Sequence, residues 1–508
     1  MRPARLLGSL LMAATMLCSP AGASAAEPEG GKLRVAILAD VNSFDPQSFL
    51  TVNFPVIKNF YDSLIEYTPE GEAVPSLATS WEIGPENRSV TVTLRDDVKF
   101  HSGAPLDARA VAATLEKAAD PQRGKNVFAT MSFVDGWEIV DERTIRLNFK
   151  ASAPDRQITD LLQFLSVIDP AAMDSVDTSP AGTGAYLLAE RKVGQEIRLK
   201  ANPDYWRDSQ PATEEVVLTI FSEDAAASAA LESGAVDLVY GGTARSAVRL
   251  KDAGYQLVRG PGPLVQVFRI NSTQGPFRNE KFRQAFNHLM PRAGILKVGY
   301  GGLGQVTALP WAPASPAADP SYNEKYAFDL DKARELLDAS GLSAAEMSDW
   351  KLLVNGGDES LVTISQVAQG TLAKAGIDVE LDIREGAEFV DAMLNGKFAA
   401  VFAAIGNIQK FPTRVATNSI YRTQNNPVFG EPHPHPAYVE AIARVNNTFS
   451  PDEVRAAYDH LNQVLVESAF AIPTNTYDIG LIVASEKVGG FTLDIDNMLV
   501  ARTIGFAD

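Results

Sequence analysis

The 508-residue sequence predicts an α/β protein with more than one hydrophobic core. Its length indicates several cores, because single domains usually run ~100–200 residues. In the first half, paired segments alternate apolar and polar residues, which is typical of antiparallel hairpins. In the second half, short apolar segments alternate with amphipathic ones, and this strand–helix order favours a parallel sheet.

Five elements are expected in the first 150 residues. Residues 32–38 form a short apolar run that predicts a strand, and residues 59–67 carry apolar side chains at helical spacing. Residues 80–94 and 136–149 each contain two alternating segments around a turn, so each predicts a hairpin. Between them, Asp107 precedes a helical run and is expected to cap its first turn.

The second half shows a strand, helix, strand, helix, strand order. The predicted strands cover residues 351–354, 379–383 and 398–405, and the helices between them cover residues 361–372 and 389–394. Further on, Ser450 and Glu453 have the spacing of a capping box, with Pro451 at the first helical position. We therefore expect a further helix to begin there.

The N-terminus has the three parts of a secretory signal peptide. Arg2 and Arg5 precede an apolar run at residues 6–17, and an Ala-x-Ala motif ends at Ala25. The apolar run is shorter than the ~20 residues of a membrane-spanning helix. We expect cleavage after residue 25 or 26, so that residues 1–26 are the signal peptide and the mature protein is soluble and periplasmic. Lipid anchoring at Cys18 is less favoured, because a leucine rather than a small residue precedes it.

The composition argues against several classes of function. The chain has 63 acidic and 45 basic residues, a formal net charge of −18. Nucleic acids and anionic membrane surfaces attract positive charge, so we expect neither as a partner. The single cysteine excludes a disulfide framework and a thiolate metal cluster.

No catalytic motif stands out. The glycines at 299, 301 and 304 fit the dinucleotide pattern G-x-G-x-x-G, but a helix-like run precedes them where a strand is required. They are better explained as a glycine-rich helix end. A P-loop, a G-x-S-x-G elbow and an H-E-x-x-H motif are all absent. We expect neither enzymatic activity nor a cofactor.

Two groups of side chains remain as binding candidates. His433 and His435 could hold one metal ion, although a proline-stiffened surface loop without a third ligand is the favoured interpretation. Lys410, Arg414 and Arg422 follow the predicted strand 398–405, and ligands of parallel sheets bind beyond the carboxyl ends of strands. These cations could receive an anionic group or could be solvated surface residues.

Several segments, in this order, strongly resemble the family 5 (peptide, nickel and opine type) substrate-binding proteins of ABC importers. They are FYDSLIEY at 60–67, VPSLATSWE at 74–82, LRDDVKFHSG at 94–103, PLDA at 105–108, GTGAY at 182–186, NPDYW at 202–206, RQAFN at 283–287 and ARELL at 333–337. The resemblance covers nearly all of the mature chain.

The resemblance implies a two-lobed periplasmic-binding-protein-like α/β fold (class II, cluster C) with an extra subdomain in the first lobe. Lobe I would comprise residues 27–76, 181–270 and 475–508, its subdomain residues 77–180, and lobe II residues 271–474. The chain would cross between lobes near residues 267–271 and 473–477. The implied function is that of a monomeric importer component, which captures a small molecule between closing lobes and delivers it to the ABC permease subunits.

The ligand itself is constrained by a departure from the family. Peptide binders of this family typically hold the peptide's amino group with an aspartate shortly after the strand equivalent to 398–405. Here Asn407 and Lys410 occupy that stretch, and neither replaces a carboxylate. We expect a small polar molecule, such as an opine, a sugar conjugate, a peptide or a modified peptide, and Lys410 and Arg414 would allow it to be anionic. A nickel or metal-chelate binder is the alternative.

The candidate ligand contacts are chosen by position along the predicted strands and crossings. They are Phe44, Asp45, Tyr240, Gly241, Gly242, Thr243, Arg269, Asn271, Ile405, Gly406, Asn407, Lys410, Arg414, Tyr421 and Tyr477. The glycine pair would let backbone N–H groups approach a ligand closely.

Overall fold

The computed structural model describes residues 31–48, 50–208, 211–260, 262–406, 411–412 and 435–506, apart from the side chains of Leu394 and Pro451. The predicted signal peptide, with Cys18, lies outside these residues. Six further residues named above also lie outside them. They are the candidate ligand contacts Asn407, Lys410, Arg414 and Tyr421, the candidate metal ligand His433 and the cation Arg422. Within the described part of the chain, no helix has the length and apolar character needed to cross a membrane.

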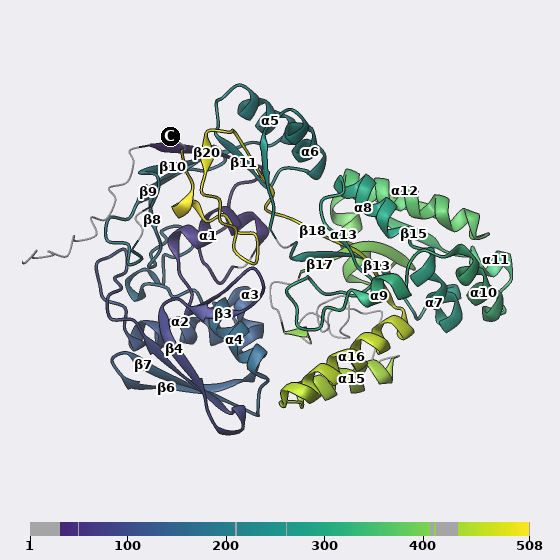
Figure 1. Ribbon diagram of the computed structural model, residues 1–508, viewed down its shortest axis with the longest axis horizontal. Coiled ribbons are helices and arrows are strands. Elements are labelled where there is room, and N and C mark those ends of the chain that lie inside the picture. Colours follow the sequence, from purple (N-terminus) through teal and green to yellow (C-terminus); the bar gives the residue numbers. More distant parts are fainter. Residues whose placement is uncertain are drawn as a thin grey trace, which may run out of the picture.

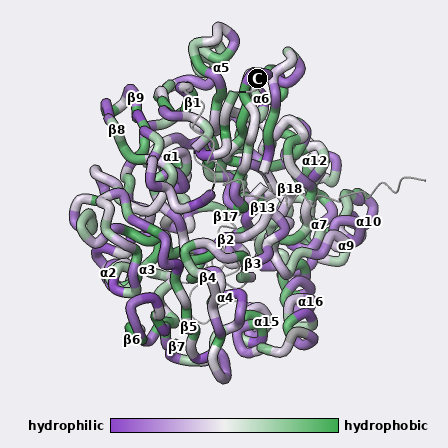
Figure 2. Tube along the Cα trace, turned by 60° about the vertical axis from the view of Figure 1, so that its left-hand side comes forward, coloured by the Kyte–Doolittle hydropathy of each residue, from purple (hydrophilic) through white to green (hydrophobic). Residues whose placement is uncertain are grey.

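Three large sheets organise the described residues into two lobes, and the first lobe carries a subdomain (Figure 1). Lobe I lies at the upper left of the figure, the subdomain at the lower left and lobe II at the right. In Figure 2, single helices such as α16 (Pro451–Ser468) carry both hydrophobic and hydrophilic stretches, as expected when one helix face packs on a core.

Lobe I is built on a seven-stranded sheet. Its strands, in spatial order, are β12 (Gln256–Val258), β19 (Ile482–Ala484), β11 (Leu238–Tyr240), β1 (Lys32–Ile37), β10 (Glu215–Ile220), β9 (Glu196–Ala201) and β8 (Tyr186–Lys192). The helices are α1 (Phe54–Phe60), α5 (Asp224–Glu232) and α6 (Ala244–Asp252). β1 pairs in parallel with both neighbours, and its last three residues are apolar and buried, as expected for a strand covered on both faces.

The subdomain is a four-stranded antiparallel sheet with helices. The sheet order is β4 (Ala78–Ile83), β5 (Ser89–Leu94), β7 (Thr144–Phe149) and β6 (Val134–Asp141). The helices are α2 (Ala108–Ala119), α3 (Lys125–Phe128) and α4 (Asp155–Phe164). Val90, Val92 and Leu94 of β5 are buried while the residues between them are partly exposed, so the predicted alternation sets the buried face. Both predicted hairpins are confirmed, and Asp107 caps α2 by accepting from Ala110 N–H at 2.9 Å.

Lobe II is built on a six-stranded mixed sheet. Its order is β14 (Gln305–Val306), β18 (Ala471–Tyr477), β13 (Leu264–Ile270), β17 (Ala400–Gly406), β15 (Lys351–Asn355) and β16 (Glu380–Arg384). The helices are α7 (Glu280–Leu289), α8 (Arg292–Tyr300), α9 (Ser321–Lys325), α10 (Leu330–Ser340), α11 (Ala344–Met347), α12 (Glu359–Lys374), α13 (Gly386–Leu394), α15 (Pro436–Asn446) and α16. β15 pairs in parallel with β16 and β17, which confirms the predicted strand–helix alternation.

Two short sheets complete the strand pairing among the described residues. β2 (Ile65–Tyr67) pairs with β3 (Ala73–Pro75) next to the subdomain, and β20 (Val488–Gly489) pairs with β21 (Gly505–Phe506). The prediction of one helix over residues 59–67 is wrong. α1 ends at Phe60, because the next residues are held extended by long-range contacts of the buried Asp62 carboxylate.

The chain crosses between the lobes twice. β12 belongs to the lobe I sheet and β13 to the lobe II sheet, so the first crossing lies at residues 259–263. β18 and β19 bracket the second crossing at residues 478–481 in the same way. The positions expected for the crossings, near 267–271 and 473–477, are therefore wrong, because both stretches belong to strands that pair with each other in the lobe II sheet.

The glycine-rich stretch at 299–304 ends helix α8, as predicted. Gly301 takes the left-handed conformation of a helix C-cap, with φ of 58°. Gly304 has φ of 144°, and a Cβ at this position would lie 2.0 Å from the backbone oxygen of Thr476. Glycine is thus required here for close packing against β18.

Candidate ligand-binding site

The edges of both sheets that lie near the crossings define the candidate site. In lobe I, the parallel strands β1 and β11 end there, at Ile37 and Tyr240. In lobe II, β17 ends at Gly406, which pairs with Leu264 just after the first crossing. Carboxyl ends of parallel strands from both lobes therefore converge, the usual location of ligands in open α/β sheets.

A buried hydrogen bond connects the lobes. The backbone N–H of Phe411, which follows β17, donates to Asp160 Oδ2 of subdomain helix α4 at 2.6 Å. Asp160 is only 3% exposed and also accepts from the Tyr67 hydroxyl at 2.8 Å. Burial and the negative charge of Asp160 raise the pKa of Tyr67, so the phenol stays protonated and donates. Arg156 stacks on the Tyr67 ring at 4.2 Å and completes the cluster.

A second contact between the lobes lies where α6 meets α8 and α12. Val248 of α6 packs so closely on Gly301 that a Cβ there would lie 2.9 Å away. Arg245 forms an ion pair with Glu359 of α12 at 2.9 Å, but both side chains are about three-quarters exposed. Exposed pairs contribute little stability, so the apolar contact carries most of this interface.

The two crossing segments are tied to each other. Arg259 Nε of the first crossing donates to Asp478 Oδ2 of the second at 3.1 Å. Asn497 Nδ2 donates to the other carboxylate oxygen at 3.0 Å, and the Asp478 side chain is fully buried. This arrangement makes the two crossings one coupled hinge element.

Phe44 and Asp45 lie inside lobe I rather than at the site. Phe44 is fully buried and packs edge-on against Phe60, with ring centroids 5.6 Å apart. Asp45, also fully buried, forms ion pairs with Lys117 at 2.7 Å and Lys125 at 3.0 Å. Burial lowers the pKa of Lys117, although the neighbouring Asp45 carboxylate acts in the opposite direction. These pairings join the early loop to the subdomain.

The Tyr240–Thr243 stretch forms a strand-to-helix turn. The Tyr240 hydroxyl donates to the Asn497 carbonyl at 2.7 Å, next to the hinge. Gly241 has φ of 77°, which favours glycine, and its N–H donates to the Leu481 carbonyl at 2.8 Å. Gly242 follows it, and the Thr243 side chain caps α6 by accepting from Ser246 N–H at 3.2 Å. The turn thus lies at the site, but the Gly241 N–H already has a partner.

Arg269 and Asn271 lie at the far end of β13 from the crossing. Asn271 shapes the turn after the strand, because its Nδ2 donates to the Phe398 carbonyl at 3.1 Å and its Oδ1 accepts from Thr273 N–H at 3.1 Å. Arg269 is 3% exposed, and its guanidinium lies 4.8 Å from the Phe398 ring. Both residues were expected at the crossing itself.

The remaining described candidates lie near the crossing. Ile405 is fully buried in the lobe II core, and Gly406 ends β17. Tyr477 stacks on Tyr300 with ring centroids 4.6 Å apart, and the Tyr300 hydroxyl donates to Gln266 Oε1 at 2.7 Å. Gly406 and Tyr477 thus flank Leu264, while Ile405 contributes packing.

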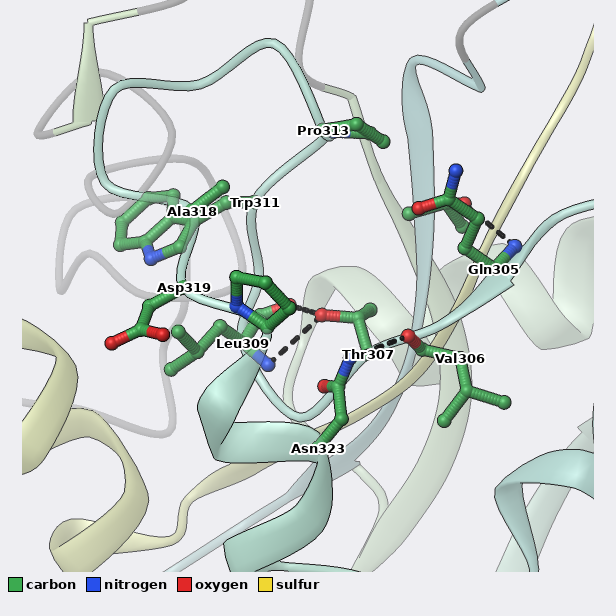
Figure 3. A pocket seen from close by; sticks show the side chains of 11 residues that line it. Gln305, Val306, Thr307, Leu309, Trp311, Pro313, Ala318, Asp319 and Asn323 are labelled. Carbon is green, nitrogen blue, oxygen red and sulfur yellow. Dashed lines mark hydrogen bonds between the residues drawn. The ribbon is translucent and has the colours of Figure 1, made fainter.

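A cavity of about 140 Å³, which the sequence did not predict, lies beside β14 and β18 (Figure 3). Its polar lining includes Gln305, Thr307, Asp319, Asn323 and Thr476. Figure 3 shows Thr307 bonded to the Leu309 backbone and Asn323 to the Val306 carbonyl of β14, so these side chains hold the segment after β14 in place. The sequence of this stretch gave no signal for a cavity.

A second cavity, of about 130 Å³, lies where α1, β2 and α4 meet the C-terminal segment. It was also missed, and its charged lining comes from distant parts of the chain: Lys58, Asp62, Glu66, Asp494 and Arg502. Lys58 and Asp494 approach to 4.0 Å. Charges of both signs face this space, which favours a zwitterionic or polar content over an apolar one.

Comparison with known proteins identifies the family. The model described as "Bacterial extracellular solute-binding proteins, family 5 Middle" matches residues 72–427. The chain belongs to this family. The match covers well over half of the sequence and confirms the resemblance drawn from the segments quoted above.

Among curated relatives, this family 5 protein is 27% identical to the glutathione-binding protein GsiB of Salmonella paratyphi A over 315 residues. That alignment covers 60% of this chain and spans 61% of the length of GsiB.

Solved structures confirm the two-lobed periplasmic-binding-protein fold. NikA from Brucella suis, in complex with Fe(III)-EDTA, superposes with a TM-score of 0.82 at 23% identity, covering 94% of this chain and all of NikA. AgaA from A. tumefacien R10, in complex with agropinic acid, gives a TM-score of 0.76 at 22% identity, covering 94% of this chain and 99% of AgaA.

In this family 5 protein, the motifs that carry the resemblance build the frame of lobe I. Asp62 accepts from Thr183 Oγ1 and from Trp206 Nε1, both at 2.9 Å, and from the Tyr205 hydroxyl at 3.3 Å. Burial raises the pKa of Asp62, while Arg207 opposes that effect. The GTGAY and NPDYW segments therefore meet at one buried carboxylate. They indicate the fold and not the ligand.

The structure assigns His435 a local contact. Its Nε2 lies 2.9 Å from Ser272 Oγ, and its ring stacks on Phe470 with centroids 4.8 Å apart. Among the described residues, no three His, Cys, Asp or Glu side chains are placed to hold a metal ion together.

Proposed function

We propose that this protein is the substrate-binding component of an ABC importer. It would capture a small polar molecule between its lobes in the periplasm and deliver it, as a monomer, to membrane permease subunits. The observation that carries the proposal is the architecture: two lobes joined by two short crossings, with Asp160 of the subdomain in contact with Phe411 of lobe II. A ligand held between such lobes lies in a closed, dry space, where each hydrogen bond gains strength.

Family membership supports a role in binding rather than in catalysis. The sequence and the relatives together support several candidate classes of ligand. GsiB is named a glutathione-binding protein and AgaA was solved with agropinic acid. Opines, sugar conjugates, peptides and modified peptides are therefore the candidates. Asn407, Lys410, Arg414 and Tyr421 remain proposed contacts on sequence grounds.

Native mass spectrometry of freshly purified mature protein tests the binding role. We expect a retained small molecule whose release converts the protein into a lighter species and lowers its thermal midpoint, because a ligand of the native state stabilises it. Calorimetry with glutathione, agropinic acid and free di- to pentapeptides then assigns the class. Tight binding of free peptides with no response to Asn407→Asp would contradict the non-peptide preference.

A metal chelate is the second candidate ligand, favoured by the fold shared with the Fe(III)-EDTA complex of NikA. Metal analysis of protein purified without chelator separates the two. A metal content that disappears in a His433→Ala/His435→Ala variant would support direct coordination. Metal that stays bound in this variant, together with a retained organic acid, would point to a chelate. Metal-free protein that retains an organic molecule would reject both.

The proposed location also has a direct test. The intact mass of protein recovered from the periplasm should match cleavage after residue 25 or 26. A mass that includes a lipid on Cys18 would place the protein on the membrane surface instead.

A further inference from the structure

Arg269 is a buried guanidinium without a counter-charge in the described chain. It is 3% exposed, and neither its Nε nor its Nη2 has a hydrogen-bond partner. None of the ion pairs formed by the described carboxylates includes it. Burial alone lowers its pKa to about 10, so the group is still charged at neutral pH.

The two other buried arginines of lobe II are built differently. Arg283 donates to the carbonyls of Ser468, Phe277 and Arg278 at 2.8 to 3.2 Å. Arg292 donates to four backbone carbonyls, the nearest at 2.7 Å. Carbonyl oxygens replace water around both structural arginines. Arg269 has no such set, and a buried charge without partners is strongly unfavourable.

No polar side chain of the neighbouring strands lies directly opposite Arg269. The residues directly opposite it are Val401 on β17 and Ala471 on β18, both buried. The aromatic ring of Phe398 covers one side of the guanidinium. An arginine that is held on an aromatic face keeps its planar fork free for a bidentate partner.

Arg269 lies on the side of the sheet that carries the contact between the lobes. Val265, Val267 and Arg269 alternate with Phe268 and Ile270, which face the opposite core. Val265 and Val267 share their core with Phe411, the residue that reaches Asp160 of the subdomain.

We propose that Arg269 binds an oxyanion, a carboxylate or a phosphate, of the molecule carried by this protein, and so selects anionic ligands. The proposal rests on the binding role proposed above. It also explains why the described part of lobe II gives this buried charge no partner: the ligand, rather than the chain, supplies it.

Thermal unfolding of wild type, Arg269→Met and Arg269→Lys tests this, with Arg245→Met as the control for loss of one exposed arginine. Each protein is freed of retained ligand by partial unfolding and refolding, then melted in inorganic phosphate or citrate against chloride at equal ionic strength. We expect both anions to raise the wild-type midpoint. The rise should disappear in Arg269→Met, shrink in Arg269→Lys and persist in Arg245→Met. In chloride, Arg269→Met should melt several degrees above wild type, because it removes an unpaired buried charge.

Three outcomes would overturn the proposal. They are an Arg269→Met protein that melts below wild type in chloride, an unchanged anion response in that variant, and a wild type that responds to neither anion. Native mass spectrometry distinguishes a failure of this proposal from a failure of the proposed binding role. Equal retention of a ligand by wild type and Arg269→Met rejects the role of Arg269 alone, whereas a wild type that retains and binds nothing rejects the binding function itself.

Discussion

The backbone N–H of Phe411 donates to the carboxylate of Asp160 at 2.6 Å, although the two residues are 251 positions apart and belong to different lobes. The acceptor is buried and shared with the Tyr67 hydroxyl. A hydrogen bond to a charged group contributes about 1.5–3 kcal/mol. This bond therefore favours the conformation in which the lobes touch.

The first prediction concerns this contact. Asp160→Asn leaves either Tyr67 or Phe411 without its acceptor, because the amide nitrogen donates where the carboxylate accepted. We expect the lobes to separate more often, which small-angle scattering would report as a larger radius of gyration. The affinity of the protein for its retained ligand should fall about tenfold, the equivalent of about 1.4 kcal/mol. Asp155→Asn, on an exposed position of the same helix, is the matched control. Identical scattering of the two variants would contradict the prediction.

The second prediction concerns the hinge. Asp478→Ala leaves Arg259 and Asn497 without their common acceptor. Arg259 is 36% exposed and can be solvated, so the loss should be about 1–3 kcal/mol, mainly from the unpaired Asn497 amide. The thermal midpoint should fall by a few degrees, and Asp478→Asn should restore part of the loss. Arg245→Ala, which breaks the exposed pair with Glu359, should change the midpoint by less than a degree or two. Equal losses in the buried and exposed variants would show that the hinge pair adds nothing.

The third prediction compares two glycines of one helix end. Gly304→Ala places a Cβ 2.0 Å from the Thr476 carbonyl oxygen, and we expect it to destabilise lobe II by about 3 kcal/mol or more. Gly302→Ala meets nothing within 4 Å and is affected only by its φ of 77°, which costs roughly 1 kcal/mol. Chemical denaturation of both variants measures the difference. A Gly302 variant as unstable as the Gly304 variant would make backbone strain, rather than the clash, the cause.

The fourth prediction concerns acid stability. Burial lowers the pKa of His101 below its ordinary value of 6.5, and its Nε2 lies 2.9 Å from the Gly184 carbonyl. The folded protein therefore resists protonation of the ring, and the unfolded chain takes up the proton first. Stability due to the neutral ring is full above pH ~6.5 and is lost as the pH falls below it. His101→Gln should flatten this part of the curve. A variant and a wild type whose midpoints fall in parallel between pH 7 and 5.5 would contradict the assignment.

Local patterns explain which parts of the fold could be predicted. The hairpins at β4–β5 and β6–β7 and the β15–β16–β17 alternation depend on periodicities within a few residues, and all were expected. The helix expected over 59–67 failed because Asp62 is bound by residues more than a hundred positions away. No local pattern records such contacts.

The site was harder to predict for the same reason. The carboxylate of Asp45 pairs with Lys117, 72 residues further along the chain. No sequence pattern near Asp45 predicts that partner. Arg269 was selected as a candidate because the crossing was placed near it, whereas the structure places it toward the other end of β13, on the sheet side that carries the contact between the lobes. Arg269 is the one charged residue of β13, which was the visible signal, but only the structure shows that its Nε and Nη2 have no hydrogen-bond partner among the described residues.

Strand β19 lies between β12 and β11 in the lobe I sheet, yet it follows both in the chain only after the whole of lobe II. During synthesis, β11 and β12 therefore lack their common neighbour until β19 emerges. Lobe II, being one continuous insertion, can fold meanwhile. Exposed strand edges invite pairing with other chains. The order of assembly should thus make lobe I the aggregation-prone half of the nascent protein and the half most dependent on a holding chaperone.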